Sequence, residues 1–441
     1  MKKLIASAIL AAVAIVAASA QDFKTSYFLD NYVYSYRLNP GAQFEDDAFT
    51  FFSVGIGNTS LTASTNLSLA SFVFANPNGP GYTWGFGESI SDEAFLSRIE
   101  NENYFYPRLS LNVLTFGRQT ANSRFAIELN VRSDSYFSAQ RDFFGAFKGG
   151  LNEGTGKGTG SYSFDNMLLK SSNYAEIAAT YSHAIGDNLV VGGTAKLLLG
   201  VLGTSFKINH LDAAYNAASD DWGGKADAEL QFSTPILSTA SMVKGKSLYD
   251  VFKDFDNYGV NGFGINGFGF GLDLGATWKP IEDLEIGLSV LDLGFLSWNP
   301  NINAKIQYEK AHFVDLEDAL EFVDVDNSAY TQALNYNIHV FGKYRMPFYD
   351  KLSAGIIGTW QKYFKEARFG VDVTPVKFVS VAASAGYNTY GFNVGAAVNF
   401  RFPGINFFLG TDSISFKSNS DKVPSGRGGL TNVTAGLAIA F

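Results

Sequence analysis

Several short stretches of the sequence have residue types that could do chemistry. Residues 262–267, GFGING, have the G-x-G-x-x-G spacing of dinucleotide-binding loops, which must lead into a helix. The residues that follow, GFGFGLDLGATW, instead alternate with a period of two and predict a strand. Residues 154–159, GTGKGT, lack the spacing of a phosphate-binding loop. Residues 241–244, SMVK, match S-x-x-K without the partner motifs of serine acylases. We expect no nucleotide cofactor.

The sequence also gives no support for a metal site or for a catalytic nucleophile. The four histidines, His183, His210, His312 and His339, lie on separate segments without the spacing of a zinc site. The chain has 0 cysteines, which excludes disulfides and thiolate metal ligands. The strand pattern does not bring a Ser/His/Asp set or a pair of acidic residues together. We therefore expect no cofactor, no metal and no enzymatic activity.

Charged residues recur between apolar ones along several segments. In residues 122–132, NSRFAIELNVR, apolar side chains occupy every second position, which predicts a strand with one apolar and one polar face. Two interpretations stay open for the polar face: an ion-pair network that fills a lumen, or a polar conduit around a ligand path. The lumen-facing candidates are Arg124, Glu128, Arg132, Asp273, Glu285, His339, Lys343, Arg345, Glu366, Arg368 and Asp372.

One strand has an inner face that is nearly free of side chains. Within residues 267–278, the glycines Gly267, Gly269, Gly271 and Gly275 share a face, while Phe, Leu and Trp side chains occupy the other. Glycine in a strand marks a bend or the close approach of another backbone or a ligand. The candidates for this face are plain curvature, a plug segment and an acyl chain.

The start of the chain predicts export. Lys2 and Lys3 precede an apolar run that ends in the A-x-A pattern of residues 18–20, so residues 1–20 read as a cleaved signal peptide. The net charge of −9 argues against nucleic acid as a partner. Beyond the signal, no apolar run reaches the about 18 residues of a transmembrane helix. An exported membrane protein without helical spans must be a β-barrel.

The alternating segments predict an all-β, transmembrane antiparallel outer-membrane β-barrel of about fourteen strands. When strands are counted back from the last residue, the connections at one end of the barrel are all short turns. The long segments, about 134–172, 204–263, 295–333 and 412–430, fall at the other end, where 204–232 could be a hairpin above the membrane. Trp278 and Trp360 fall at opposite strand ends, as in an aromatic girdle.

The C-terminus and N-terminus take separate roles in this fold. Leu437, Ile439 and Phe441 lie on one face of a strand that runs to the last residue, and are candidates for a C-terminal signal read by the outer-membrane assembly machinery. Residues 21–48 precede any convincing strand and contain many tyrosines, so we expect a plug or a periplasmic segment. Residues 49–441 form the barrel, with the last strand closing beside the first.

Three stretches carry a resemblance to a known family. YRLNPGAQF, FTFFSVGIGNTSLTAS and GLDLGATWKPIEDLEIGLSVLDLGFLSW, with the terminal Phe, resemble an uncharacterised family of Bacteroidetes outer-membrane barrels. That family is similar to long-chain fatty-acid transporters and to barrels associated with type IX secretion. The resemblance implies a barrel whose motifs, residues 38–41 and 292–294 with Trp298, mark architecture rather than chemistry. The transporters have an N-terminal plug, which residues 21–48 match in position.

The resulting expectation for function is a non-enzymatic barrel that takes up or binds small hydrophobic molecules passively. The alternative is a barrel that binds a partner protein as an accessory to secretion or surface attachment, with its long loops as the docking surface. Expected partners are outer-membrane lipid, the assembly machinery, and a hydrophobic small molecule or a secretion-system protein.

Overall fold

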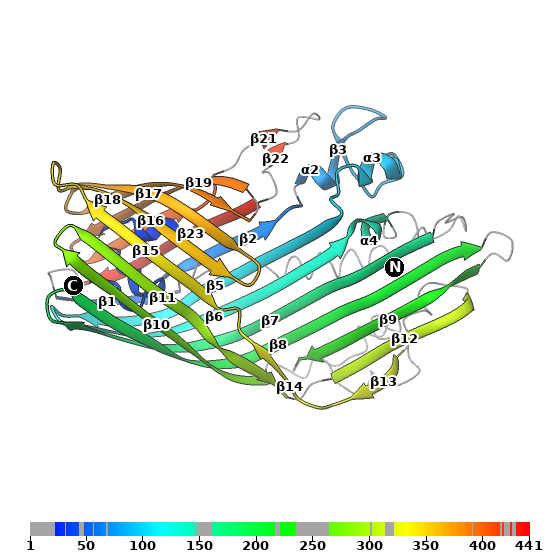
Figure 1. Ribbon diagram of the computed structural model, residues 1–441, viewed down its shortest axis with the longest axis horizontal. Helices are drawn as coiled ribbons and strands as arrows, with labels where there is room; N and C mark the ends of the chain where they lie inside the picture. The colour runs from blue at the N-terminus through cyan, green and yellow to red at the C-terminus, as the bar shows by residue number, and fades with distance from the viewer. Residues whose placement is uncertain are drawn as a thin grey trace.

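The alternating segments form strands that run antiparallel around a closed ring (Figure 1). The computed structural model describes residues 23–30, 32–43, 48–55, 57–67, 69–145, 148, 161–216, 221–234, 264–299, 302–313, 322–389, 391–414, 417–418, 424–425 and 429–441. The expected signal peptide and the stretches 154–159 and 241–244 lie outside these residues.

Fourteen strands close the barrel, as the strand count predicts. The first strand is interrupted, so that β1 and β2 together lie between β23 and β5. Successive neighbours pair around the ring until β20 pairs with β23. In ring order the strands are β1 (Phe49–Val54) with β2 (Thr59–Thr65), β5 (Glu102–Gln119), β6 (Ser123–Gln140), β7 (Ser161–Ile185), β8 (Leu189–Asn216), β10 (Gly267–Ile281), β11 (Leu284–Trp298), β15 (Asn337–Arg345), β16 (Leu352–Gln361), β17 (Lys365–Val376), β18 (Val379–Asn388), β19 (Gly391–Phe402), β20 (Ile405–Thr411) and β23 (Gly429–Ala440).

The last residue takes part in closing the ring. The amide of Phe441 donates to the carbonyl of Thr50 at 2.9 Å, and the amide of Thr50 donates back at 2.7 Å. Near the middle of the same seam, Gly55 has a φ of 81° and begins the interruption between β1 and β2. The chain there bulges inward, so that the carbonyl of Gly57 contacts the inner face of Gly436.

The two ends of the barrel differ in their connections. At one end, which we name the short-turn end, the strands join through residues 120–122, 186–188, 282–283, 346–351, 377–378 and 403–404. The opposite end, named the long-loop end, carries most of the additional elements. These are α2 (Leu69–Phe72), β3 (Val73–Ala75), β4 (Tyr82–Trp84), α3 (Asp92–Leu96), α4 (Arg141–Gly145), β9 (Asp221–Ser233), β12 (Ile302–Phe313), β13 (Phe322–Asp326), β14 (Tyr330–Ala333), β21 (Lys417–Ser418) and β22 (Pro424–Ser425).

Strands continue well beyond the barrel wall at the long-loop end, where long loops and one hairpin were expected. β7 and β8 stay paired as far as Ser161 and Ala214, and β8 and β9 form the expected hairpin around residues 204–232. β12 pairs with β9 and β13, so a projecting sheet extends from one side of the barrel (Figure 1). Helices and loops cover the apolar face of this sheet, around Phe95, Phe144 and Phe322. None of the described helices is long and apolar enough to cross a membrane.

The outer wall is apolar and the inner face is not. Trp278 and Trp360, 51% and 47% exposed, lie on the outer wall at opposite ends of the barrel, as expected for an aromatic girdle. The exposed apolar side chains form a continuous band around the outer wall, and lipid covers such a band. The chain is therefore an outer-membrane β-barrel. Other outward apolar side chains include Phe116, Ile127, Phe268, Phe270, Leu272, Leu274, Ile286, Leu288, Val340, Ile356, Phe369, Val381, Val433, Leu437 and Ile439.

The N-terminal segment, residues 23–43, lies within the ring of strands. It contains two 3-10 turns, η1 (Lys24–Tyr27) and η2 (Ser35–Arg37), and most of its side chains are buried. The Phe28 ring packs directly against Gly370, and the Phe23 ring packs directly against Gly410. These wall glycines leave the space that the aromatic rings of the segment occupy.

Adding one methyl group to the wall tests this fit. We expect Gly370→Ala to lower the free energy of unfolding by about 1–3 kcal/mol, because the new Cβ would overlap the Phe28 ring. The matched control is Gly342→Ala, where the nearest atom to a new Cβ is Ile356 Cγ2 at 3.7 Å. Urea unfolding in detergent, followed by tryptophan fluorescence, measures the difference. Equal stability of the two variants would contradict the packing.

Candidate functional site

The first residues of the N-terminal segment bind one wall carboxylate, Asp412, at the end of β20. Asp412 is fully buried and accepts hydrogen bonds from the amide of Lys24 at 2.9 Å and the amide of Thr25 at 2.7 Å. The Thr25 hydroxyl donates a third, at 2.6 Å, and lies 2.8 Å from the Ser384 hydroxyl. We name these contacts the Asp412 latch.

A charge network surrounds the latch. The Lys24 ammonium lies 3.8 Å from Glu366 Oε2, and Glu366 Oε1 accepts from the Arg368 guanidinium at 2.9 Å. Arg368 also donates to Ser384 Oγ at 2.7 Å, to the carbonyl of Asp412 at 2.8 Å and to Asn393. All four charged groups are buried, so each cation needs its carboxylate.

The middle of the segment is held by a second charged pair. Arg37 donates to the carbonyl of Asn58 at 2.9 Å and to Ser110 Oγ at 3.0 Å, and its Nε lies 3.7 Å from Glu128 Oε2. The Tyr36 hydroxyl donates to Glu128 at 3.0 Å. Glu128 therefore holds the N-terminal segment and also accepts a hydrogen bond from Thr115 Oγ1 on β5 at 3.3 Å.

The 38–41 motif contacts the wall near the end of the segment. Asn39 Nδ2 donates to Thr277 Oγ1 at 2.8 Å, and the Ser182 hydroxyl donates to the carbonyl of Pro40 at 2.6 Å. The backbone of Gly41 contacts Gly275 in β10. This motif thus fits a backbone into a glycine-lined part of the wall.

A third cluster, named the central cluster, lies on the inner faces of the wall strands, and Asn130 bridges it to the segment by bonding both Arg37 and Glu176. Arg132 binds Asp292 through both guanidinium ends, at 2.9 and 3.0 Å, and binds Glu176 at 2.7 Å. The Lys196 ammonium lies 2.7 Å from Asp273 and 2.6 Å from Asp292. Each of the five side chains belongs to a residue no more than 5% exposed. Two cations and three carboxylates therefore join five different strands.

The remaining candidates from the sequence lie nearer the short-turn end or apart from the clusters. The Lys343 ammonium lies 2.6 Å from Asp30, whose amide donates to Ser380 Oγ, and Ser380 in turn donates to Asp372. Glu285 pairs with Lys279 at 3.3 Å. The other placements are Arg124, which donates to the carbonyl of Gln43, His339, which bonds Thr359, and Arg345, which is exposed.

The glycine-rich face of β10 meets the N-terminal segment, wall side chains and the backbone of β11. Gly275 contacts the N-terminal segment, Gly271 lies against the stem of Lys196, and Gly267 lies beneath the indole of Trp298. Gly269 contacts the backbone of the neighbouring β11. Part of this face therefore receives a plug-like backbone, and part receives wall side chains.

Three members of the central cluster, Glu176, Lys196 and Asp292, were missing from the candidates drawn from the sequence. The alternation in NYAEIAATYS and GGTAKLLLG places Glu176 and Lys196 on polar faces, and this signal could have found them. Asp292 is different, because its φ of 58° coincides with a register shift between β10 and β11. The bulge reverses the alternation, so a period-two pattern misassigns Asp292.

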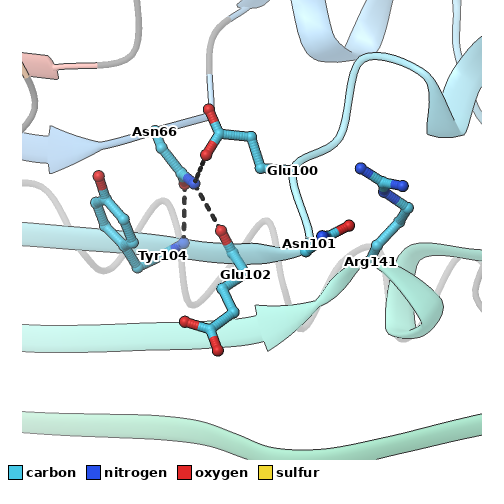
Figure 2. A pocket seen from close by; sticks show the side chains of 6 residues that line it. All are labelled: Asn66, Glu100, Asn101, Glu102, Tyr104 and Arg141. Atoms are coloured by element: carbon cyan, nitrogen blue, oxygen red, sulfur yellow. Dashed lines mark hydrogen bonds between the residues drawn. The ribbon is translucent and has the colours of Figure 1, made fainter.

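Two further features lie at the long-loop end. His210, on the projecting sheet, hydrogen-bonds Asp165 at 2.6 Å and Asp212 at 2.7 Å, and these bonds raise the pKa of the imidazole. An open pocket lies where β5 and β6 leave the barrel, and the Asn66 amide there bonds Glu100 and the backbone of Glu102 and Tyr104 (Figure 2). Because both ends of that amide are engaged, Asn66 fixes the end of β2 within the pocket.

A family model matches residues 40–412, so the chain belongs to that family, which is described as a family of unknown function, DUF5723. No curated protein matches the chain. Similar solved structures include the Pseudomonas putida toluene transporter TodX, at 10% identity and a TM-score of 0.42, covering 94% of this chain and 95% of TodX. A Pseudomonas aeruginosa FadL homologue shows 12% identity and a TM-score of 0.42, covering 91% and 92%. Similarity this low carries no information about ligands.

Proposed function

We propose that this chain is a non-enzymatic barrel for the passive uptake of small hydrophobic molecules, with residues 23–43 as a displaceable plug. The observation that carries the proposal is an aromatic cluster between plug and wall. The Tyr32 and Tyr34 rings lie 4.9 and 5.8 Å from the Phe408 ring, and the Tyr27 ring lies 4.7 Å from the Phe341 ring. The cluster comprises Phe23, Tyr27, Phe28, Tyr32, Tyr34, Tyr36, Phe49, Phe51, Phe341 and Phe408.

Aromatic lining of this kind suits apolar molecules rather than ions or sugars. If the plug withdraws, wall rings such as Phe51, Phe341 and Phe408 lose their apolar partners, and an apolar molecule can replace them. The polar groups around the plug carry both signs of charge and are paired, so they favour neither cations nor anions. The wall thus offers apolar rings for contact with a ligand, surrounded by polar groups whose charges are paired.

A plug that moves requires non-covalent attachment, and the contacts found between segment and wall are of that kind. These contacts are hydrogen bonds, ion pairs and ring packing, all of which can break and re-form. The mixed polar and apolar character of these contacts resembles an interface between two proteins more than a barrel core.

Transport into sealed vesicles tests this function. Purified protein in liposomes is offered a radiolabelled aromatic hydrocarbon and, separately, a sugar of similar size, with empty liposomes as the control. We expect the protein to accelerate entry of the hydrocarbon well above that of the sugar. Equal acceleration of both solutes, or of neither, would refute hydrophobic uptake.

One observation favours the second candidate, a barrel that binds a partner protein in secretion or surface attachment. The projecting sheet carries charged side chains in cross-strand pairs, such as Lys225 with Glu309 at 2.7 Å, that stand clear of the apolar band. Deleting residues 204–232 removes β9 and the outer part of β8. Under the uptake proposal this deletion spares hydrocarbon entry, whereas a partner protein that copurifies with the intact chain would be lost. Entry lost while the partner stays bound would contradict this division of roles.

A further inference from the structure

We propose that two stacked tyrosines, Tyr136 and Tyr363, form a second closure of the lumen at the long-loop end. We further propose that the short loop 362–364 links this closure to the first residues of the plug. The inference rests on the proposed uptake function and adds a gate with named residues on the side from which molecules would enter.

The stacked pair joins opposite walls of the barrel. Tyr136 belongs to β6, and Tyr363 lies in the connection between β16 and β17. In one direction around the ring, the strands between β6 and β17 are β7, β8, β10, β11, β15 and β16. In the other direction they are β5, β1/β2, β23, β20, β19 and β18. Because the two paths are equally long, β17 lies opposite β6. The two rings are nevertheless stacked, with centroids 4.0 Å apart and planes at 12°.

Further contacts reinforce the closure. Tyr106 on β5 packs edge-on against both rings, with centroids 5.9 Å from Tyr136 and 5.5 Å from Tyr363. Its hydroxyl donates to Asp134 at 3.2 Å, and Asp134 also accepts from Asn335 Nδ2 at 2.8 Å. Asn335 lies between β14 and β15, so a second connection reaches across the lumen beside the tyrosines.

The loop that carries Tyr363 also touches the plug. The next residue, Phe364, is 1% exposed, and the Lys24 ammonium lies 4.6 Å from the centre of its ring. Two backbone hydrogen bonds between Gln361 and Phe364, at 2.8 and 3.4 Å, make the loop a tight turn. A tight turn moves as a unit, so a shift of Phe364 shifts Tyr363.

This arrangement couples the tyrosine closure to the start of the plug. Lys24 contacts the loop through Phe364 and contacts β17 through Glu366, while the adjoining amides are held by Asp412. When the start of the plug leaves the latch, Phe364 and Glu366 lose the cation that holds the loop in place. The stacked tyrosines then separate, and the long-loop end opens together with the plug.

A reporter cysteine behind the closure tests this coupling, because the chain has 0 cysteines of its own. Ser172, on β7, is 2% exposed and accepts a hydrogen bond from Gln332 beside the closure. Full-length Ser172→Cys protein in liposomes is treated with a membrane-impermeant maleimide, and the labelling rate is measured. We expect slow labelling in this background, and about tenfold faster labelling after Tyr363→Ala or after Lys24→Met.

Controls separate the gate from general loosening. Tyr363→Phe keeps the stacked ring and should keep the slow rate, and so should Tyr387→Ala, which removes a ring 72% exposed on the outer wall. Reduced mobility on unheated gels confirms that each variant is folded. An unchanged rate in Tyr363→Ala overturns the closure, and an unchanged rate in Lys24→Met overturns the coupling. Labelling needs no transport, so failure of hydrocarbon entry with the expected labelling rates would refute the uptake function alone.

Discussion

Replacing Asp412 by alanine is expected to convert a silent barrel into a conducting one. The carboxylate accepts three hydrogen bonds from Lys24 and Thr25, and all of these groups are buried. Hydrogen bonds to a charged group contribute about 1.5–3 kcal/mol each, and the alanine would also leave two buried amides without an acceptor. The start of the plug should therefore detach. Planar-bilayer recording should show stepwise openings that the unmodified chain lacks.

A graded pair of variants sharpens this test. Asp412→Asn keeps one acceptor oxygen and should open less often than Asp412→Ala. Asp350→Ala removes an exposed carboxylate in a turn at the short-turn end and should remain silent. If Asp412→Ala is also silent, the latch does not hold the barrel closed.

Replacing Arg132 by alanine is expected to be the most destabilising single change in the wall. Arg132 bridges Asp292 and Glu176 in the central cluster, where the Lys196 ammonium would be left to serve three carboxylates. Breaking a buried ion pair from one side costs about 3–5 kcal/mol, because the remaining charges lose their partner. Urea unfolding of the folded barrel in lipid should show a loss of this size.

The matched control is Arg118→Ala, which removes an exposed arginine from β5 and should change stability little. A double-mutant cycle with Asp292→Ala tests the cause: the double variant should be less destabilised than the sum of the two single variants. Additive losses would mean that the two side chains act independently, against the observed bidentate pair.

Much of the architecture could be predicted because a barrel wall repeats one simple rule. Lipid outside and a polar lumen inside impose alternation on every strand, so the strand number and the closing strand at Phe441 follow from the sequence. The projecting sheet was harder to foresee. A hairpin above the membrane was expected at residues 204–232, where β8 and β9 pair, but the addition of β12 and β13 to it was not.

The functional interior was only partly predictable, for two physical reasons. Asp292 lies at a bulge that reverses the alternation, so its inward position depends on tertiary structure. The contacts of Asp412, Tyr136 and Tyr363 join segments far apart in the chain, and no local pattern encodes which walls approach each other. The 38–41 motif, by contrast, was singled out by its resemblance to an outer-membrane barrel family, and its contacts lie in a glycine-lined part of the wall.

The most direct test of a displaceable plug is to lock it reversibly. Thr25 and Ser384 have side-chain oxygens 2.8 Å apart, so cysteines at both positions can approach a disulfide S–S length of about 2.05 Å. In this cysteine-free chain, Thr25→Cys with Ser384→Cys ties the start of the plug to β18. We predict that hydrocarbon entry into liposomes stops in the oxidised protein and returns after reduction, while each single variant is indifferent to reductant. Undiminished entry with the disulfide formed would show that molecules pass without displacing the plug, and would contradict the account.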